Sequence, residues 1–323
     1  MRIRGAFRST LMGLGLAGLT ALGLPGCGGG GPETGDAVVV TPPAADPPTA
    51  PAPTPAAPAI EAAPEPAATA PETEAKPEAE AAPETASPTQ AEGWGTLKGR
   101  VTLTGGDAPA VKVLVERGKA SKDSDFCAAE APIMSERLIV DESTKGIKNA
   151  LVYIPNPSAV NPDAEKAASS ARFEFDQKNC AFDPHVMVVM SGSEVQLKSS
   201  DPVTHNVNIR LVNTLGNTLM SAGGTAAVTA GDPERRPGQI VCDIHNWMQA
   251  WWMVLDSPYF AVTDAEGNFE IQDVPAGTQR VVVWQEAVQR GGFVTAPGGD
   301  DVQIKPGEPT VQDYSIDLAT IRP

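Results

Sequence analysis

The sequence predicts an all-β protein of the β-sandwich type, preceded by a disordered tether. From Trp94 onward, short runs of alternating apolar and polar residues recur, separated by turns rich in Gly, Pro and Asp. No long stretch of residues 93–323 has helical periodicity. Short strands at close spacing favour a sandwich. The composition also changes sharply near residue 92, because residues 33–92 are almost wholly Pro, Ala, Thr and Glu.

Residues 1–27 have the features of an export signal. A basic start is followed by an apolar run, Leu11 to Leu24, that is too short and too rich in glycine for a comfortable membrane span. The run ends at Cys27, before four glycines. This pattern resembles a bacterial lipoprotein signal, which implies lipidation of Cys27 and a protein anchored to a bacterial membrane, periplasmic or at the cell surface. The alternative is ordinary signal cleavage and a soluble exported protein.

Residues 28–92 are expected to form a disordered linker. There are 14 prolines from Pro42 to Pro88, and 11 acidic residues from Glu33 to Glu92 against one base, Lys76. Such a segment has too little apolar area to offset the entropy cost of ordering. We therefore expect it to act as a spacer between the anchor and the folded part.

The charge balance argues against nucleic-acid binding. The chain has 323 residues and a net charge of −16, so no basic face is available to neutralise phosphates. Arg235 and Arg236 form one small basic spot. They either steer an anionic partner or belong to a solvated loop.

The strands expected from alternation follow one another at short intervals. In chain order they are 97–103, 111–115, 147–154, 173–175, 186–190, 195–197, 207–211, 251–255, 260–263, 268–271, 279–284 and 311–316. Pro155 and Pro157 stop the third strand, and residues 156–170 are expected to be loop or a short helix.

The main candidate site is the stretch Cys242-x-x-His245-x-x-Met248. A soft thiolate, two imidazoles and a weak thioether form the ligand set of a blue copper site. The chain has two other histidines, His185 and His205, and one of them must supply the second imidazole. A structural zinc site would need four strong ligands, for which Met248 is poorly suited. The alternative for Cys242 is a buried core thiol.

Residues 172–256 resemble the amicyanin-like and plastocyanin-like cupredoxins. The likeness rests on Gly192 to Val195, on His205-Asn206-Val207, and on the Cys-x-x-His-x-x-Met loop before a closing strand. It implies a Greek-key β-sandwich that binds one copper ion through His205, Cys242, His245 and Met248. In this family the ligand loop usually lies at the surface, so His245 would be the electron port.

The same resemblance assigns roles to neighbouring residues. Asn206 would hydrogen-bond the ligand loop and hold it for the metal, or else be a turn asparagine. His185 falls on no ligand position and is expected to be structural. Trp247 would be either a docking contact or apolar cover over the site.

A second likeness, to the carboxypeptidase regulatory-like, transthyretin-like β-sandwich, frames the first. It rests on Gly99-Arg100-Val101, Asn149 to Val152, Thr263 to Phe269, and Pro275-Ala276-Gly277. It implies a discontinuous domain of residues 94–156 plus 257–323, with the cupredoxin inserted in one loop. Insertion is well tolerated when the ends of the inserted domain lie close together. Exported bacterial copper proteins with this combination include some described as methylamine-utilisation-like.

Two cysteines remain, Cys127 and Cys180. In an exported protein they form one possible disulfide, and the alternative is two buried free thiols.

These features predict a single-electron carrier with an unidentified redox partner protein. The alternatives are a copper-binding or delivery protein without a redox partner, and a structural or adhesive surface lipoprotein. An enzyme is not expected, because Cys242 and His245 are too close in sequence for an obvious nucleophile–base pair. The sequence also shows no hydrolytic triad or phosphate loop.

Overall fold

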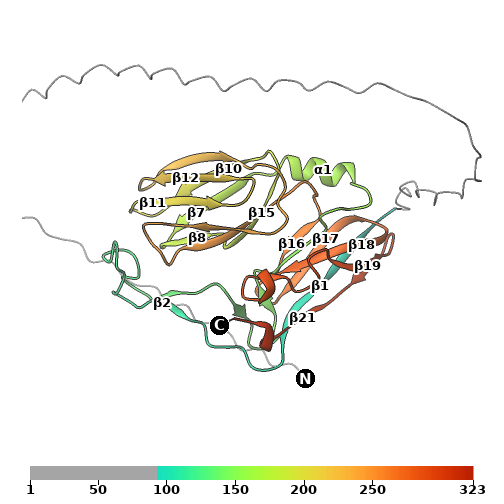
Figure 1. The fold of residues 1–323 in the computed structure, drawn as a ribbon, viewed down its shortest axis with the longest axis horizontal. Helices are drawn as coiled ribbons and strands as arrows, with labels where there is room; N and C mark the ends of the chain where they lie inside the picture. Colours follow the sequence, from blue (N-terminus) through green and yellow to red (C-terminus); the bar gives the residue numbers. More distant parts are fainter. Residues whose placement is uncertain (1–92, 323) are drawn as a thin grey trace, which may run out of the picture. The chain divides into compact units, whose positions relative to one another are not determined.

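The computed structural model describes residues 93–322 (Figure 1). The predicted all-β class is confirmed, since strands make up nearly all the regular structure of this range. The export signal, Cys27 and the tether lie outside the described residues. No helix within residues 93–322 is long and apolar enough to span a membrane.

The middle of the chain, residues 173–255, forms a sandwich of two sheets, here called the central sandwich. Its five-stranded sheet has the order β12 (Leu215–Met220), β11 (His205–Arg210), β14 (Gly238–Val241), β15 (Gln249–Leu255) and β9 (Val186–Met190). Its four-stranded sheet has the order β13 (Thr225–Thr229), β10 (Glu194–Ser199), β7 (Phe173–Lys178) and β8 (Ala181–Asp183). The pairs β15–β9 and β10–β7 are parallel, and the remaining pairs are antiparallel.

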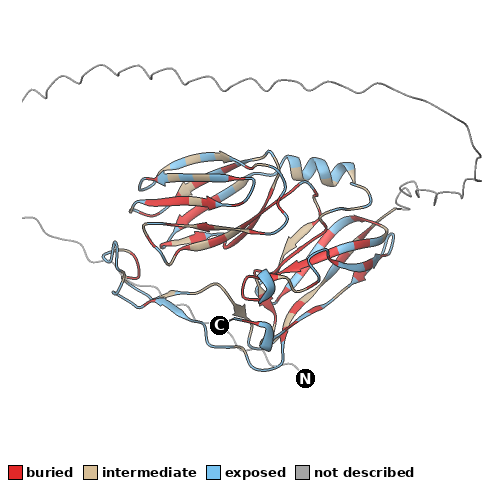
Figure 2. Cartoon of the chain, viewed as in Figure 1, coloured by how far each residue is buried: buried red, intermediate tan, exposed pale blue. Residues whose placement is uncertain are grey.

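The core of the central sandwich follows from strand alternation. In β10, Val195 and Leu197 are fully buried, while Gln196 between them is exposed. Phe175 packs on the ring of Phe182 at 5.0 Å and edge-on against Trp252 at 4.9 Å. These offset and edge-to-face contacts are the favoured aromatic arrangements. Figure 2 shows the buried residues along the strands of both sheets.

The strands on either side of this stretch form a second sandwich, here called the flanking sandwich. One sheet contains β17 (Asn268–Pro275), β1 (Trp94–Thr104), β20 (Pro309–Val311) and β21 (Tyr314–Asp317). The other has the order β16 (Phe260–Val262), β6 (Leu151–Tyr153), β18 (Gly277–Trp284) and β19 (Asp300–Ile304). The chain leaves this sandwich after β6 and returns at β16, and these two strands pair with each other. The two ends of the central stretch therefore lie side by side.

The two sandwiches share a buried apolar contact. Leu151 and Tyr153 of β6 pack in one cluster with Val186 and Val188 of β9, and Met253 of β15 belongs to the same cluster. The apolar run of β15 therefore serves both cores, because Trp252 points into the central sandwich and Met253 points out of it.

A long excursion separates β1 from β6. It contains two short ribbons, β2 (Val113–Val115) with β3 (Ile133–Met134) and β4 (Ile139–Val140) with β5 (Ile147–Lys148). The tip between β2 and β3, residues 116–132, is here called the strap. A disulfide from Cys127 of the strap to Cys180 of the central sandwich spans a Cα–Cα distance of 5.6 Å. This is the disulfide that the sequence analysis gave as possible.

Several elements differ from those expected. Seven strands were not expected from the sequence: β3, β4, β8, β12, β13, β14 and β19. The first three have only two or three residues each, and the other four carry many polar residues and weak apolar alternation. The expected strand 311–316 is split into β20 and β21. The short helix is α1 (Pro162–Ser169), with Pro162 in its first turn and Asn161 as the N-cap, accepting from the Asp163 amide at 2.9 Å.

Candidate metal centre

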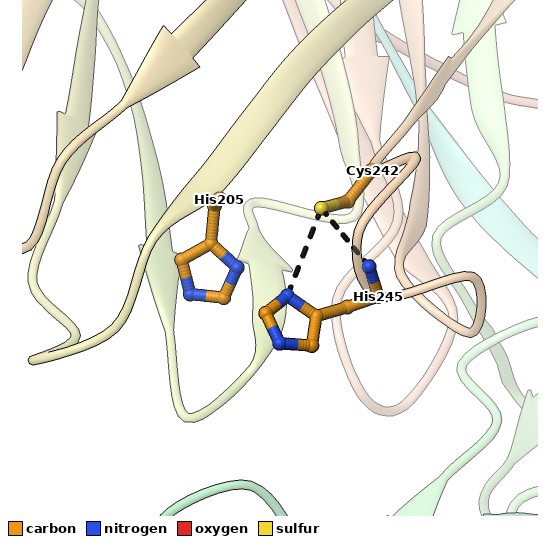
Figure 3. Close-up of side chains that lie close together, drawn as sticks. All are labelled: His205, Cys242 and His245. Carbon is orange, nitrogen blue, oxygen red and sulfur yellow. Dashed lines mark hydrogen bonds between the residues drawn. The ribbon is translucent and has the colours of Figure 1, made fainter. Parts of the chain in front are cut away.

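Three buried side chains converge at one end of the central sandwich (Figure 3). His205 is the first residue of β11, Cys242 directly follows β14, and His245 lies in the loop between β14 and β15. One nitrogen of each imidazole and the Cys242 sulfur all lie within 4.8 Å of one another. The structure thus brings together three of the four ligands named from the sequence, across 40 residues of chain.

The ligand loop is held by hydrogen bonds that involve the ligands themselves. The Met248 amide donates to the His245 carbonyl at 2.9 Å, and the Cys242 amide donates to the Met248 carbonyl at 3.3 Å. The His245 amide lies 3.4 Å from the Cys242 sulfur and donates to it. This closed turn points the thiol and the imidazole of a short Cys-x-x-His segment toward the same place.

Both imidazoles are oriented by carboxylates through the same ring nitrogen. Nε2 of His205 lies 2.9 Å from Asp201, and Nε2 of His245 lies 2.8 Å from Asp123. A carboxylate that hydrogen-bonds one nitrogen of a histidine is the usual partner of a metal-binding imidazole. Each ring therefore presents Nδ1 to the space beside Cys242.

The Nδ1 atoms show that the residues present fit a metal. Nδ1 of His245 is 3.8 Å from the Cys242 sulfur. Nδ1 of His205 is buried and has no hydrogen-bond partner among the described residues. A buried polar atom left without a partner is costly and needs an explanation, which a bound metal ion supplies. The donor set is one sulfur and two imidazole nitrogens, which suits a soft or borderline metal.

The protonation states of the three groups are coupled. Burial of His205 opposes protonation, but Asp201 and Cys242 outweigh it and raise the pKa of His205 to about 9. Burial also opposes ionisation of Cys242, yet His205 and nearby backbone amides outweigh it and lower the pKa of this thiol. Burial lowers the pKa of His245, which favours its neutral form. A metal would therefore displace a proton from His205, and the lowered pKa of Cys242 favours the thiolate form that binds metal.

Asn206 connects β11 to the ligand loop through hydrogen bonds, as expected for a residue that holds the loop in place. Its Oδ1 accepts from the Asp243 amide at 2.7 Å and lies 3.3 Å from the Cys242 sulfur. Its Nδ2 donates to the Asp243 carboxylate at 2.9 Å. Asp243 also receives hydrogen bonds from Asn208, Asn217 and Arg210, so the base of the loop is fixed from several sides.

The expectation that His245 lies at the surface is wrong, and its role as the electron port stays a prediction. The side chain of His245 is 0% exposed, because Asp123 of the strap bonds to its outer nitrogen. The ring of Trp247 lies 5.1 Å from the ring of His245, and Trp247 Nε1 donates to the Cys180 carbonyl at 3.1 Å. The strap is fixed at this place by the disulfide to Cys180. Asp123, 39% exposed, is thus the group between His245 and solvent.

Two further residues from the sequence analysis have their positions described. Met248 is buried in the same apolar cluster as Cys242, and its role as a metal ligand stays a prediction. His185 is buried away from the three ligands, where Nε2 hydrogen-bonds Glu286 and Nδ1 lies 3.7 Å from Glu136.

Sequence reasoning missed both orienting carboxylates. Asp201 lies only four residues before His205, so it had a local signal. Asp123 is 122 residues from His245 in sequence, and its only indirect signal was Cys127 nearby.

Comparisons with known proteins give only partial structural matches. No family model matches the chain, and no curated protein matches it. Amicyanin from Paracoccus versutus aligns at 13% identity over 32% of this chain and 96% of its own, with a TM-score of 0.24. A purple cupredoxin from Nitrosopumilus maritimus aligns at 16% identity over 25% of this chain and 98% of its own, with a TM-score of 0.23.

A copper-containing nitrite reductase from Thermus scotoductus SA-01 aligns at 17% identity over 26% of this chain, with a TM-score of 0.23. The chain spans only 22% of the length of that reductase. Scores at this level carry no argument, so the interpretation of the site rests on its own geometry.

Proposed function

We propose that the protein binds one copper ion in a type 1 (blue) site and transfers single electrons. The observation that carries the proposal is the buried convergence of His205, Cys242 and His245 within 4.8 Å, with Nδ1 of His205 left without a hydrogen-bond partner among residues 93–322. When bound, copper would supply a one-electron couple between Cu(I) and Cu(II). We also propose that residues 172–256 form a cupredoxin-like domain. The flanking sandwich would be a carboxypeptidase regulatory-like domain.

The chain's own residues would keep the donors in one arrangement for both oxidation states. His205 and His245 would bind through Nδ1, Cys242 through its thiolate, and Met248 weakly through its thioether. Asp201 and Asp123 hold the two rings, and Asn206 holds the loop. Such support from outside the ligand shell reduces rearrangement when an electron is gained or lost.

Burial favours an electron carrier over a copper-delivery protein. All three donors are buried, and the strap covers His245. A delivery site must pass its metal to another protein's ligands, which requires open access to at least one donor. An electron can cross a covering layer that an ion cannot cross.

The visible spectrum of the purified protein loaded with Cu(II) tests the proposal. An intense blue thiolate-to-copper band, followed by a reversible one-electron couple, is the expected result. Copper bound without blue colour, or Cu(I) lost readily to a chelator, would favour delivery. A folded, colourless protein that binds no copper would sink the copper proposal and favour the structural or adhesive surface lipoprotein.

We also propose that the protein is exported, held on a bacterial membrane by a lipid on Cys27, and paired with a redox protein. The leader sequence described above supports this. The variant Cys27→Ala should move the protein from the membrane fraction to the soluble fraction of cells. Retention of Cys27→Ala in the membrane fraction would contradict the anchor.

Replacing Asp123 by asparagine should raise the reduction potential of the copper site. The substitution removes a negative charge hydrogen-bonded to His245, and this charge favours Cu(II) over Cu(I). Asp123 is 39% exposed, so solvent screening limits the effect to roughly 20–60 mV, which is at most about 1.4 kcal/mol for one electron. Cyclic voltammetry of the copper-loaded variant measures it.

Asp125→Asn is the matched control for this substitution. Asp125 is an exposed acid of the same strap and makes no side-chain hydrogen bond or ion pair among residues 93–322. Its replacement removes the same charge but should leave the potential almost unchanged. Equal shifts in the two variants would show that Asp123 acts only through net charge.

A further inference from the structure

A cleft away from the metal ligands is lined by an unusual concentration of arginine. It has a volume of ≈ 490 Å³ and is lined by residues of both the central and the flanking sandwich. Its lining arginines are Arg137, Arg210, Arg236, Arg290 and Arg322. The cleft falls within the size range of small-molecule sites in proteins.

The choice of basic residue is selective. Residues 93–322 contain ten arginines and ten lysines, yet five arginines and no lysine line the cleft. Arginine presents a planar fork of donors that matches carboxylate and phosphate oxygens two at a time, whereas lysine is a point charge. Solvation alone does not require this preference, because either residue keeps a surface soluble.

Most of these arginines lack an acidic partner. Arg210 is 3.1 Å from Asp243, but none of the other four has a carboxylate within 4.0 Å in the described part of the chain. On a protein with a net charge of −16, cations that are gathered together and left unpaired repel one another. A bound anion would remove this repulsion.

The two acidic residues of the cleft already accept hydrogen bonds from other protein groups. Glu234 accepts from the Asn213 amide at 2.6 Å. Glu286 hydrogen-bonds His185 through one oxygen and accepts from Trp251 Nε1 at 2.8 Å through the other. These buried carboxylates therefore make their hydrogen bonds to the wall, and neither forms an ion pair with an arginine among residues 93–322.

Arg137 offers the cleft a buried donor that no protein group uses among the described residues. Its Nε is buried and has no hydrogen-bond partner among the described residues. Its backbone is held in the wall, because Gln285 donates to the Arg137 carbonyl at 2.8 Å. A buried guanidinium nitrogen without an acceptor is costly unless a bound oxygen satisfies it.

We propose that this cleft binds a small anion with two or more carboxylate or phosphate groups. The arginines would receive its oxygens, and the indole rings of Trp251 and Trp284, which lie 5.1 Å apart, would provide flat apolar walls. The proposal does not depend on copper, since none of the metal ligands lines the cleft.

Isothermal titration calorimetry of the full chain with citrate, and separately with pyrophosphate, tests the proposal. Ionic strength is held constant with NaCl, because screening alone changes weak anion binding. We expect one site for at least one of the two anions. The double variant Arg137→Gln/Arg290→Gln should bind it roughly 10- to 100-fold more weakly, through the loss of two charge-assisted contacts.

Arg172→Gln is the control, because Arg172 is exposed and lies outside the cleft but carries the same charge. It should bind within about twofold of the unmodified protein. Citrate binding alone would assign a carboxylate ligand, and pyrophosphate binding alone would assign a phosphate ligand. Binding of neither anion, or an equal loss in the control, would overturn the proposal.

Thermal unfolding of each variant checks that the fold is intact. If Arg137→Gln destabilises the wall, the single variant Arg290→Gln, whose side chain is exposed, carries the same comparison. Unchanged affinity in a folded Arg290→Gln protein would then overturn the role of the arginine cluster.

Discussion

Replacing Cys242 by serine should abolish the blue colour of the copper-loaded protein. The band requires a thiolate bound to Cu(II), and a serine hydroxyl is neither soft nor ionised near neutral pH. Cys242 is the only free cysteine among the described residues, so no other thiolate there can replace it. The absorption spectrum, together with the copper content per protein, measures both the lost band and the weakened binding.

Paired histidine variants give the matched control for this result. His205→Gln removes a proposed ligand and should also abolish the colour. His185→Gln removes a buried histidine that hydrogen-bonds Glu286, away from the three converging donors, and should leave the band in place. A blue Cys242→Ser protein would refute the assignment of the thiolate, and a colourless, folded His185→Gln protein would refute the assignment of His205 as the second imidazole.

Removing the Cys127–Cys180 disulfide should cause the largest loss of stability among the variants proposed for this protein. The double variant Cys127→Ala/Cys180→Ala opens a cross-link with a sequence separation of 53 residues. The chain-entropy model gives a loss of about 4 kcal/mol in the free energy of unfolding for a loop of this size. Equilibrium unfolding in urea measures the change, with the midpoint expected at a lower denaturant concentration.

The same variant should also alter the metal centre. The strap would no longer be fixed beside the ligand loop, so the hydrogen bond from His245 Nε2 to the Asp123 carboxylate should be lost. The reduction potential of the copper site should then move in the same direction as in Asp123→Asn. Adding Asp123→Asn to the double cysteine variant should change this potential little further. A fully additive shift would show that the disulfide and Asp123 act independently.

The metal ligands could be predicted from the sequence because most of them lie close together in the chain. Cys242, His245 and Met248 occupy one turn of seven residues, and the closed loop that brings the thiol and imidazole together needs no distant contact. The all-β class was similarly accessible, since alternation is a property of each strand. The polar strand β12 escaped detection because its side chains alternate between exposed and half-buried positions and give little apolar contrast.

The residues that surround the ligands could not be predicted from local sequence patterns. His245 was expected at the surface, but Asp123 and Trp247 cover it. The covering strap comes from a different part of the chain, before β6, and is held beside the loop by the disulfide to Cys180 and by the hydrogen bond between His245 and Asp123. The arginine cleft is the same kind of feature, because Arg137 and Arg290 lie 153 positions apart in the numbering.

The sequence by itself therefore determined the class of fold and the chemical nature of the donors. Periodicity and the spacing of Cys242 and His245 are local properties of the chain, and local properties can be read without coordinates. Only the tertiary structure decided that His245 is buried, that Asp123 and Asp201 orient the imidazoles, and that five arginines share one cleft. Each of these depends on the packing of segments far apart in sequence, which no local pattern encodes.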